Sequence, residues 1–249
     1  MNIRKKATTL GMMSALCLVA PALAEGGHWA YQGNTGPSHW ASLSPDFSTC
    51  KLGGLQSPID IRGAKAADLP AIRFDYKPSP LKIVDNGHTI QVNYAPGSSI
   101  EVGAARYELV QFHFHRPSEE RINGKAHAMD AHLVHRNSAG ELAVVAVLLD
   151  KGQDNPTLRA VWSNLPKQKE KEVAAPATID AAALLPADKG YYTFQGSLTT
   201  PPCSEGVRWF VLKTPMTLAA NELTAFAKLY PMNARPTQPL NGRAVEATR

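Results

Sequence analysis

Two histidines separated by a single residue, His113 and His115, lie in the sequence Gln-Phe-His-Phe-His at positions 111–115. Side chains of a β-strand alternate between its two faces, so both imidazoles would share one face, opposite Phe112 and Phe114. Two imidazoles placed in this way can chelate a transition metal such as zinc, copper, iron or nickel. Two ligands do not complete a metal site, so a third donor must come from elsewhere in the chain. The alternative is that both are partly buried histidines with ordinary hydrogen bonds.

The segment 128–135 offers the third donor if it forms a strand beside the first. In this strand Asp130 and His132 would share one face. His135 would lie on the opposite face together with His127, which predicts surface or packing roles for both. Three histidines from two neighbouring antiparallel strands leave one coordination position open, as in catalytic rather than structural zinc sites.

The elements that must position these side chains are predicted to be short strands. Runs rich in β-branched and aromatic residues recur between residues 59 and 149, separated by Pro, Gly, Asn and Asp. They predict strands at 71–76, 81–84, 89–94, 107–110, 110–116, 128–135 and 141–149. The turns at 123–124 (Asn-Gly) and 138–140 are short, so the last three strands should be antiparallel neighbours.

Helices are expected to be few, short and peripheral. Asp154, Asn155 and Pro156 supply cap and first-turn signals for a helix at 157–165. Thr217 would cap a second helix at 218–229. Both segments are amphipathic, which is typical of helices that cover a sheet rather than form its core.

Residues 1–24 have the composition of a secretory signal, with three basic residues, an apolar run and the ending Ala-Leu-Ala. The apolar run, 7–20, is shorter than the ~20 residues of a membrane span, so no membrane anchor is expected after cleavage. The remaining chain, 25–249, is predicted to form one domain. Its first part, up to residue 51, shows no sustained period and should be an irregular segment wrapped over the body.

Removal of the signal changes the charge and the cysteine content. The full chain has a formal net charge of +5, and the signal contributes three basic residues and no acidic ones. The remainder has no cluster of Lys and Arg interleaved with aromatic residues, which argues against a nucleic-acid partner. Two of the three cysteines remain, Cys50 and Cys203. An even pair in an exported chain suggests a disulfide, and two free buried thiols are the alternative.

Seven short motifs, in order along nearly the whole chain after the signal, resemble those of the α-class carbonic anhydrases and in particular of exported bacterial members. No single motif is decisive, but the ordered set is specific. The motifs are Gln56-Ser57-Pro58-Ile59-Asp60-Ile61, Asn86-Gly87-His88, Gln111-Phe112-His113-Phe114-His115, Pro117-Ser118-Glu119, His132-Leu133-Val134-His135, Gly196-Ser197-Leu198-Thr199-Thr200-Pro201-Pro202 and Arg235-Pro236-Thr237-Gln238-Pro239-Leu240. The resemblance implies a mostly β (α+β) fold with a large, twisted, mainly antiparallel central sheet and short peripheral helices. It also implies a periplasmic zinc lyase that reversibly hydrates carbon dioxide to bicarbonate and a proton.

The same resemblance implies a zinc ion (Zn2+) held by His113, His115 and His132, with water or hydroxide as the fourth ligand. Neutral imidazoles leave the metal its full double charge, which favours hydroxide over water near neutral pH. By resemblance, Thr199 accepts a hydrogen bond from the zinc-bound hydroxide and donates its own proton to an ionised Glu119. This pairing would aim the hydroxide at carbon dioxide.

Further roles are implied for residues around the zinc ligands. His88 matches the family's proton shuttle, a role that suits a group with an unperturbed pKa near ~6.5. The implied hydrophobic wall of the substrate pocket is Val134, Val144, Leu198 and Trp209, with Thr200 at its polar edge and Tyr31 in the network near Thr199. The implied hydrogen-bond acceptors of the three ligand imidazoles are Gln111 for His113, the backbone carbonyl of Asn233 for His115, and Asp130 for His132. A disulfide between Cys50 and Cys203 that holds the Thr199 loop is implied as well, with cis bonds at 57–58 and 201–202.

Position 130 departs from the family pattern, because the family usually has Glu where this chain has Asp130. The side chain is one methylene shorter, so its hydrogen bond to His132 must lengthen, recruit a water or be met by backbone movement. The resulting hypothesis is weaker zinc retention than with Glu, which the zinc dissociation constant of Asp130→Glu would test. Glu120 and Leu55 are further departures, and they put in doubt only the hydrogen-bond network beneath the site.

Two other functions are compatible with the same fold. Non-catalytic zinc-holding or binding modules on this fold typically lack one or more zinc histidines, whereas this chain has all three together with Thr199 and Glu119. A zinc esterase with another substrate would share the chemistry and is separated only by assay. No Gly-x-Ser-x-Gly motif supports a serine hydrolase. Carbon dioxide and bicarbonate are therefore the expected partners of a chain that would act as a monomer or dimer.

Overall fold

The computed structural model describes residues 27–249, so the signal interpreted at 1–24 lies outside the described residues. Runs of β-branched and aromatic residues form most of the strands, as their fit to a pleated, half-buried surface predicts. The main sheet consists of β2 (Lys65–Ala67), β3 (Ile72–Asp75), β4 (Ser79–Asp85), β5 (Ile90–Asn93), β6 (Ser99–Val102), β7 (Ala105–His115), β10 (Met129–Arg136), β11 (Leu142–Lys151), β12 (Val173–Ile179), β13 (Tyr191–Ser197), β14 (Glu205–Leu212), β15 (Met216–Leu218) and β16 (Glu246–Thr248). A small second sheet consists of β1 (Asp60–Ile61), β8 (Arg121–Ile122) and β9 (Lys125–Ala126).

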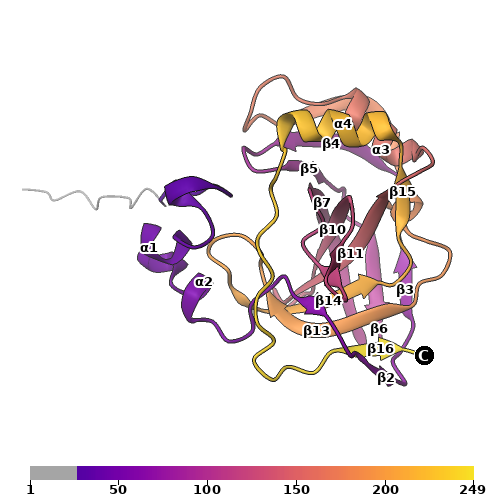
Figure 1. Ribbon diagram of the computed structural model, residues 1–249. Coiled ribbons are helices and arrows are strands. Elements are labelled where there is room, and N and C mark those ends of the chain that lie inside the picture. The colour runs from indigo at the N-terminus through magenta and orange to yellow at the C-terminus, as the bar shows by residue number, and fades with distance from the viewer. Residues whose placement is uncertain (1–26) are drawn as a thin grey trace, which may run out of the picture.

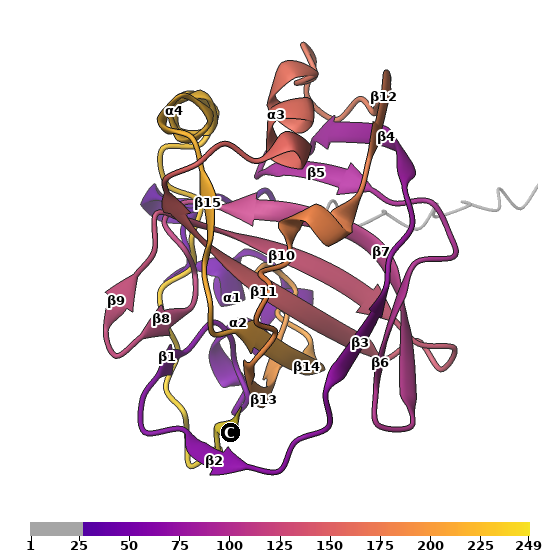
Figure 2. The same ribbon diagram turned by 90° about the vertical axis from the view of Figure 1, so that its right-hand side faces the viewer.

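The main sheet is large, twisted and mainly antiparallel, as predicted. Its strands follow the order β12-β4-β5-β7-β10-β11-β14-β13-β16-β2, and β3, β6 and β15 pair off this path. In Figure 2 the strands fan from β12 and β4 at one end of the sheet to β13 and β2 at the other. The parallel pairs within it are β11 with β14, β11 with β15, and β16 with β2.

The centre of the sheet is formed by β7, β10 and β11, which pair as antiparallel neighbours as predicted. The predicted short turn at 123–124 does not join β7 to β10, however, because the small strands β8 and β9 lie between them in the chain. The segments predicted at 107–110 and 110–116 form one continuous strand, β7. The Asn123-Gly124 turn joins β8 to β9. Both of its residues have positive φ, 51° and 83°, a conformation that Asn and Gly adopt more readily than other residues.

Strand β11 separates two apolar cores. Its odd-numbered residues from 143 to 149 belong to the larger core, and its even-numbered residues from 144 to 148 belong to the smaller one. This alternation follows from the period of two in a strand. Residues directly opposite each other in paired strands point to the same face, so His132, opposite Ala146, lies on the face of the smaller core. The predicted ligands therefore stand on one defined side of the central strands.

The helices are short and lie at the periphery, as predicted. They are α1 (Trp40–Leu43), α2 (Thr49–Leu52), α3 (Pro156–Ser163) and α4 (Ala220–Leu229), with 3-10 turns at Gly33–Thr35, Pro45–Phe47 and Ala181–Leu184. Figure 1 shows α3 and α4 together near β4, well apart from α1 and α2. Asn155 caps α3 as predicted, because its side chain accepts from the N–H groups of Thr157 at 3.0 Å and Leu158 at 3.2 Å. No helix among residues 27–249 has the length and apolar character to cross a membrane.

The predicted cap at Thr217 is wrong. Thr217 lies in β15, which pairs with the end of β11, and α4 begins only at Ala220. The N–H of Ala219 is bonded instead to the side chain of Glu222 at 2.7 Å. Strand pairing across the sheet has here outweighed a cap signal that depends on local sequence alone.

The prediction of an irregular N-terminal segment is also corrected. The described part of residues 25–51 contains α1, most of α2 and two 3-10 turns. These elements are anchored by the fully buried Trp40, whose ring packs against Trp29 at 5.2 Å and Tyr31 at 5.9 Å between centroids. Aromatic packing therefore orders a segment that has no hydrophobic period.

Candidate active site

The three predicted histidines converge on one face of the two central strands. His113 and His115 stand at the end of β7, and His132 lies directly opposite His113 on β10. The ring centroid of His113 lies 5.0 Å from that of His115 and 5.5 Å from that of His132. The centroids of His115 and His132 are 4.6 Å apart. One nitrogen from each ring lies within 4.8 Å of the other two, a spacing that one metal ion can bridge.

Hydrogen bonds determine which ring nitrogen of His113 and His115 is left for a metal. With the neutral tautomer that these partners require, His113 donates from Nδ1 to Oε1 of Gln111, and His115 donates from Nδ1 to the backbone carbonyl of Asn233, each over 2.8 Å. Nε2 of His115 is buried and has no hydrogen-bond partner among the described residues. A buried polar atom without a partner costs ~1–3 kcal/mol, which coordination of a metal would offset. The donor set therefore fits a metal ion.

His132 is turned the other way, so that Nδ1 is left for a metal. Its Nε2 lies 3.1 Å from Oε2 of Glu120 and 3.3 Å from Oδ2 of Asp130. Its ring packs against that of Trp209 in a T-shaped arrangement, with the centroids 5.0 Å apart and an angle of 81° between the planes. The contact to Asp130 is longer than a good N–H···O bond, as its shorter side chain anticipates, and the contact to Glu120 was not predicted.

Burial and neighbouring charges shift the pKa values of this group of side chains. Burial, followed by repulsion from His115 and His132, holds the pKa of His113 well below its ordinary value, which suits a neutral ligand. Burial alone would lower the pKa of His132, but the charges and hydrogen bonds of Asp130 and Glu120 outweigh burial and raise it. Burial also raises the pKa of Glu120 to about 7, against the opposing effect of His132.

Glu119 lies beneath the histidines and is fully buried. Its Oε1 accepts the backbone N–H of Arg235 at 2.7 Å, while Oε2 has no hydrogen-bond partner among the described residues. Thr199 is 6% exposed and lines the same cavity as the histidines. The predicted hydrogen bond between Thr199 and Glu119 is not formed among the described residues, so Oε2 is the acceptor that remains available for it.

The histidines open into a cavity of about 250 Å³. All the residues predicted for the substrate pocket line it, namely Val134, Val144, Leu198, Thr200 and Trp209, together with Tyr31 and His88. Trp209 is held in place by a hydrogen bond of 3.1 Å from its Nε1 to the carbonyl of Ser197. The apolar side chains and the three histidines therefore line the same cavity.

His88 lies in the wall of the cavity and is partly exposed. Its ring stacks on Trp29, with the ring centroids 3.6 Å apart and an angle of 7° between the planes. Burial, followed by repulsion from His28 and Lys169, lowers the pKa of His88. Stacking of this kind restricts the ring to one orientation.

The predicted disulfide between Cys50 and Cys203 is confirmed. It ties α2 to the loop that follows Thr199. The carbonyl of Cys203 accepts from Gln56 at 3.1 Å, and the carbonyl of Cys50 accepts from Arg235 at 2.9 Å. The same loop contains the cis bond at 201–202, and the cis bond at 57–58 is present as well. Arg235, whose backbone N–H holds Glu119, thus also donates to the backbone of Cys50.

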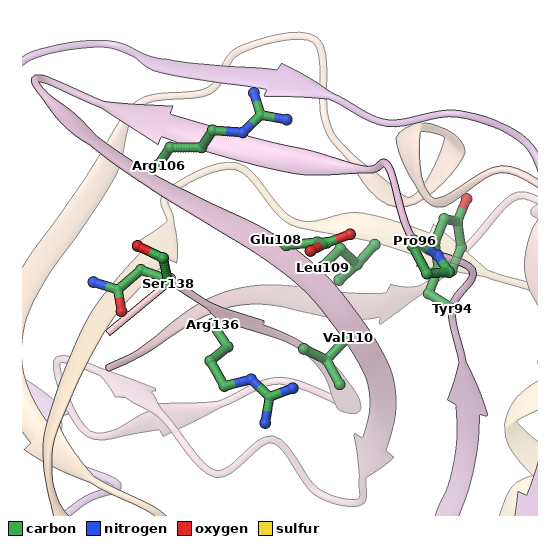
Figure 3. Close-up of a pocket in the computed structure, with 9 residues that line it drawn as sticks. Tyr94, Pro96, Arg106, Glu108, Leu109, Val110, Arg136 and Ser138 are labelled. Atoms are coloured by element: carbon green, nitrogen blue, oxygen red, sulfur yellow. The ribbon is translucent and has the colours of Figure 1, made fainter. Parts of the chain in front are cut away.

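A larger hollow of about 530 Å³ lies away from the histidines. Figure 3 shows its lining along β7 and the end of β10, with Arg106, Glu108, Val110 and Arg136 among the side chains. Arg106 is already paired with Glu101 at 3.0 Å. No histidine or cysteine lines this hollow, so the smaller cavity is the candidate site on chemical grounds.

The sequence model of the eukaryotic-type carbonic anhydrase family matches residues 35–249. The chain belongs to this family. A carbonic anhydrase from Nostoc sp. is 43% identical over 245 residues, which cover 96% of this chain and 92% of the relative. The α-carbonic anhydrase of Thermovibrio ammonificans, solved with the inhibitor sulfanilamide, superposes with a TM-score of 0.86 at 43% identity and covers 90% of this chain and 100% of its own. A hyperthermostable carbonic anhydrase from a hydrothermal vent chimney gives a TM-score of 0.87 at 45% identity, with coverage of 89% and 100%. Reversible hydration of carbon dioxide is the activity that membership of this family assigns to the enzyme.

Sequence reasoning on this carbonic anhydrase missed three residues that shape the site. Glu120 was treated only as a departure beneath the site, although a second carboxylate directly after Glu119 was a visible signal. Arg235 belongs to a matching motif but has no predicted role in the site, and Trp29 has none either. Their contacts join segments far apart in the chain, which no local pattern reveals.

Proposed function

We propose that the enzyme is a zinc-dependent carbonic anhydrase of the periplasm, with His113, His115 and His132 as the zinc ligands. The observation that carries this proposal is the convergence of three ring nitrogens, each left free by the hydrogen bonding of the opposite nitrogen. When bound, zinc supplies a Lewis acid that makes water a nucleophile near neutral pH, for which carbonic anhydrases are the standard example.

Thr199 and Glu119 would orient the attacking water. A buried Glu119 whose Oε2 is unpartnered among the described residues can accept a proton donor, and the hydroxyl of Thr199 is the donor that the family resemblance assigns. A hydroxyl that donates to a carboxylate presents its lone pairs to the water, so it can only accept from it. Arg235 supports this role because its backbone N–H holds Oε1 of Glu119 in place.

The apolar wall would bind carbon dioxide, which is small and carries no net charge. Val144, Trp209 and Leu198 line the cavity next to His132, and Val144 and Trp209 are almost completely buried. Such a surface binds an apolar substrate without competing for the polar groups that orient water. Bicarbonate, being charged, binds this wall weakly and can leave.

His88 would export the proton to buffer. It lies in the wall of the cavity and is partly exposed, so one side of its ring can face the cavity while protons reach solvent from the other. An imidazole can take and give a proton near neutral pH. The stacking on Trp29 favours a fixed relay position rather than a swinging ring.

Export to the periplasm is supported by the disulfide, since such bonds persist in oxidising compartments. N-terminal sequencing of the periplasmic protein is expected to begin at Glu25, directly after the proposed signal. A cytoplasmic fraction with the full N-terminus would contradict this location.

Stopped-flow measurement of carbon dioxide hydration tests the mechanism. Activity should be lost with a zinc chelator and in the variant His115→Ala, and it should return when zinc is added to the parent. The matched control is His127→Ala, because His127 lies outside the cavity and contacts Asp150 at 3.0 Å. Activity that resists the chelator would refute the zinc mechanism, and bound zinc without activity would favour a non-catalytic module.

A further inference from the structure

We propose that Glu120 is the residue that orients His132 toward the metal, and that Asp130 mainly holds the chain segment that carries Glu119. The family resemblance implies that Asp130 alone orients His132. In this structure the two carboxylates have different roles. The inference rests on the proposed zinc site and deepens it by adding a positioning residue for the third ligand.

Nε2 of His132 is closer to Glu120 than to Asp130. Oε2 of Glu120 lies 3.1 Å from this nitrogen, within the range of a good N–H···O bond, whereas Oδ2 of Asp130 lies 3.3 Å from it. The same Oδ2 accepts the backbone N–H of Glu119 over the shorter distance of 2.7 Å. The shorter contact of Asp130 is therefore the one to the backbone N–H of Glu119, and its contact to the imidazole of His132 is the longer one.

Hydrogen bonds fix the backbone on both sides of Glu120. Ser118 donates from its hydroxyl to the carbonyl of Glu120 at 2.8 Å and accepts the N–H of His127 at 2.9 Å. On the other side the N–H of Arg121 is bonded to the carbonyl of Ile59 at 3.2 Å. A fully buried side chain on a segment held in this way stays in one position, as a ligand-orienting group must.

Burial of two carboxylates at this position has an energetic cost. Glu120 and Asp130 are both fully buried beside one imidazole, and each has an oxygen without a hydrogen-bond partner among the described residues. Burying carboxylates in this way opposes folding, so stability does not account for both of them. A carboxylate that accepts from a ligand imidazole makes the imidazole a better metal ligand, which does account for Glu120. The shortened side chain at position 130 is thus offset by a longer one at position 120.

Zinc affinity measured by competition with a chelator tests the proposal. Glu120→Gln, which keeps the size of the side chain, should raise the zinc dissociation constant by about 10- to 100-fold. Asp130→Asn should raise it less. Asp130→Glu in the Glu120→Gln background should restore part of the lost affinity, because the longer side chain can reach Nε2 of His132. In the cobalt-substituted protein, Glu120→Gln should also shift the visible absorption bands, which report ligand geometry.

The matched control is Asp150→Asn, since Asp150 forms a histidine–carboxylate pair with His127 outside the site, and its zinc affinity should equal that of the parent. If Glu120→Gln does not fold, as judged by circular dichroism of the metal-free chain, Glu120→Asp withdraws the carboxylate and should weaken binding in the same way. A Glu120 variant with the zinc affinity and cobalt spectrum of the parent would overturn the inference. A parent that binds no zinc would instead refute the proposed function.

Discussion

Removal of the imidazole of His135 should make the stability of the fold less sensitive to acid. His135 lies on β10 but on the face of the larger core, and it is fully buried. Its Nε2 is 2.8 Å from the hydroxyl of Tyr76. Burial lowers the pKa of His135 to about 3, so the folded protein keeps this ring neutral at any pH in the working range.

The magnitude follows from the difference between the folded and unfolded pKa values. The unfolded chain takes up a proton at His135 below its ordinary pKa of ~6.5, whereas the folded chain does not until about pH 3. Stability is therefore fully present above the unfolded pKa, falls as the pH drops below it, and levels off near the folded pKa. At pH 5, about 1.5 units below the unfolded pKa, the loss is about 2 kcal/mol at ~1.4 kcal/mol per unit.

Urea unfolding at roughly pH 7.5 and pH 5 measures this effect in the parent and in His135→Gln. Gln can still accept from the hydroxyl of Tyr76 but does not titrate. A chelator should be present throughout, because loss of a bound metal in acid would add a second pH dependence. The drop in the free energy of unfolding between the two pH values should be about 2 kcal/mol smaller in the variant. The exposed His39→Gln serves as control, and an equal drop in parent and His135→Gln would refute the reasoning.

Three further predictions concern the disulfide, the shuttle and the apolar wall. Replacement of both Cys50 and Cys203 by Ser should lower the free energy of unfolding by up to about 5 kcal/mol, because the bond joins residues 153 apart in sequence; an unchanged urea midpoint would contradict it. His88→Ala should lower kcat by roughly 100-fold in weak buffer while kcat/KM stays close to that of the parent, and a loss that imidazole buffer fails to restore would argue against a shuttle. Trp209→Ala removes a buried ring and should cost about 3–5 kcal/mol, measured by urea unfolding, whereas Trp209→Phe should cost less. Equal stability of the two variants would show that the indole does not support the wall.

The sequence alone determined which of the candidate side chains share one face of a strand. Alternation along a strand is a local property, so the shared face of His113 and His115 could be predicted without knowing the fold. The same holds for the opposite placement of His135, which packs into the larger core beside Tyr76. The turn at 123–124 was local as well, because its φ values depend on the two residues that form it, but the strands that it joins, β8 and β9, were not predicted.

The tertiary structure decided what lies behind the ligands. The acceptor of His115 is a carbonyl 118 residues away, and Glu119 is held by a backbone N–H 116 residues away. Such contacts depend on how loops pack against one another in the folded chain. A backbone N–H or carbonyl is present in almost every residue, so the residue type does not show which one will form the hydrogen bond. The relative reach of Glu120 and Asp130 toward His132 is a matter of tenths of an ångström, set by the backbone on which each side chain stands. Sequence therefore predicts which histidines share a face because strand geometry is periodic, whereas the orientation of His132 depends on packing that only the folded chain provides.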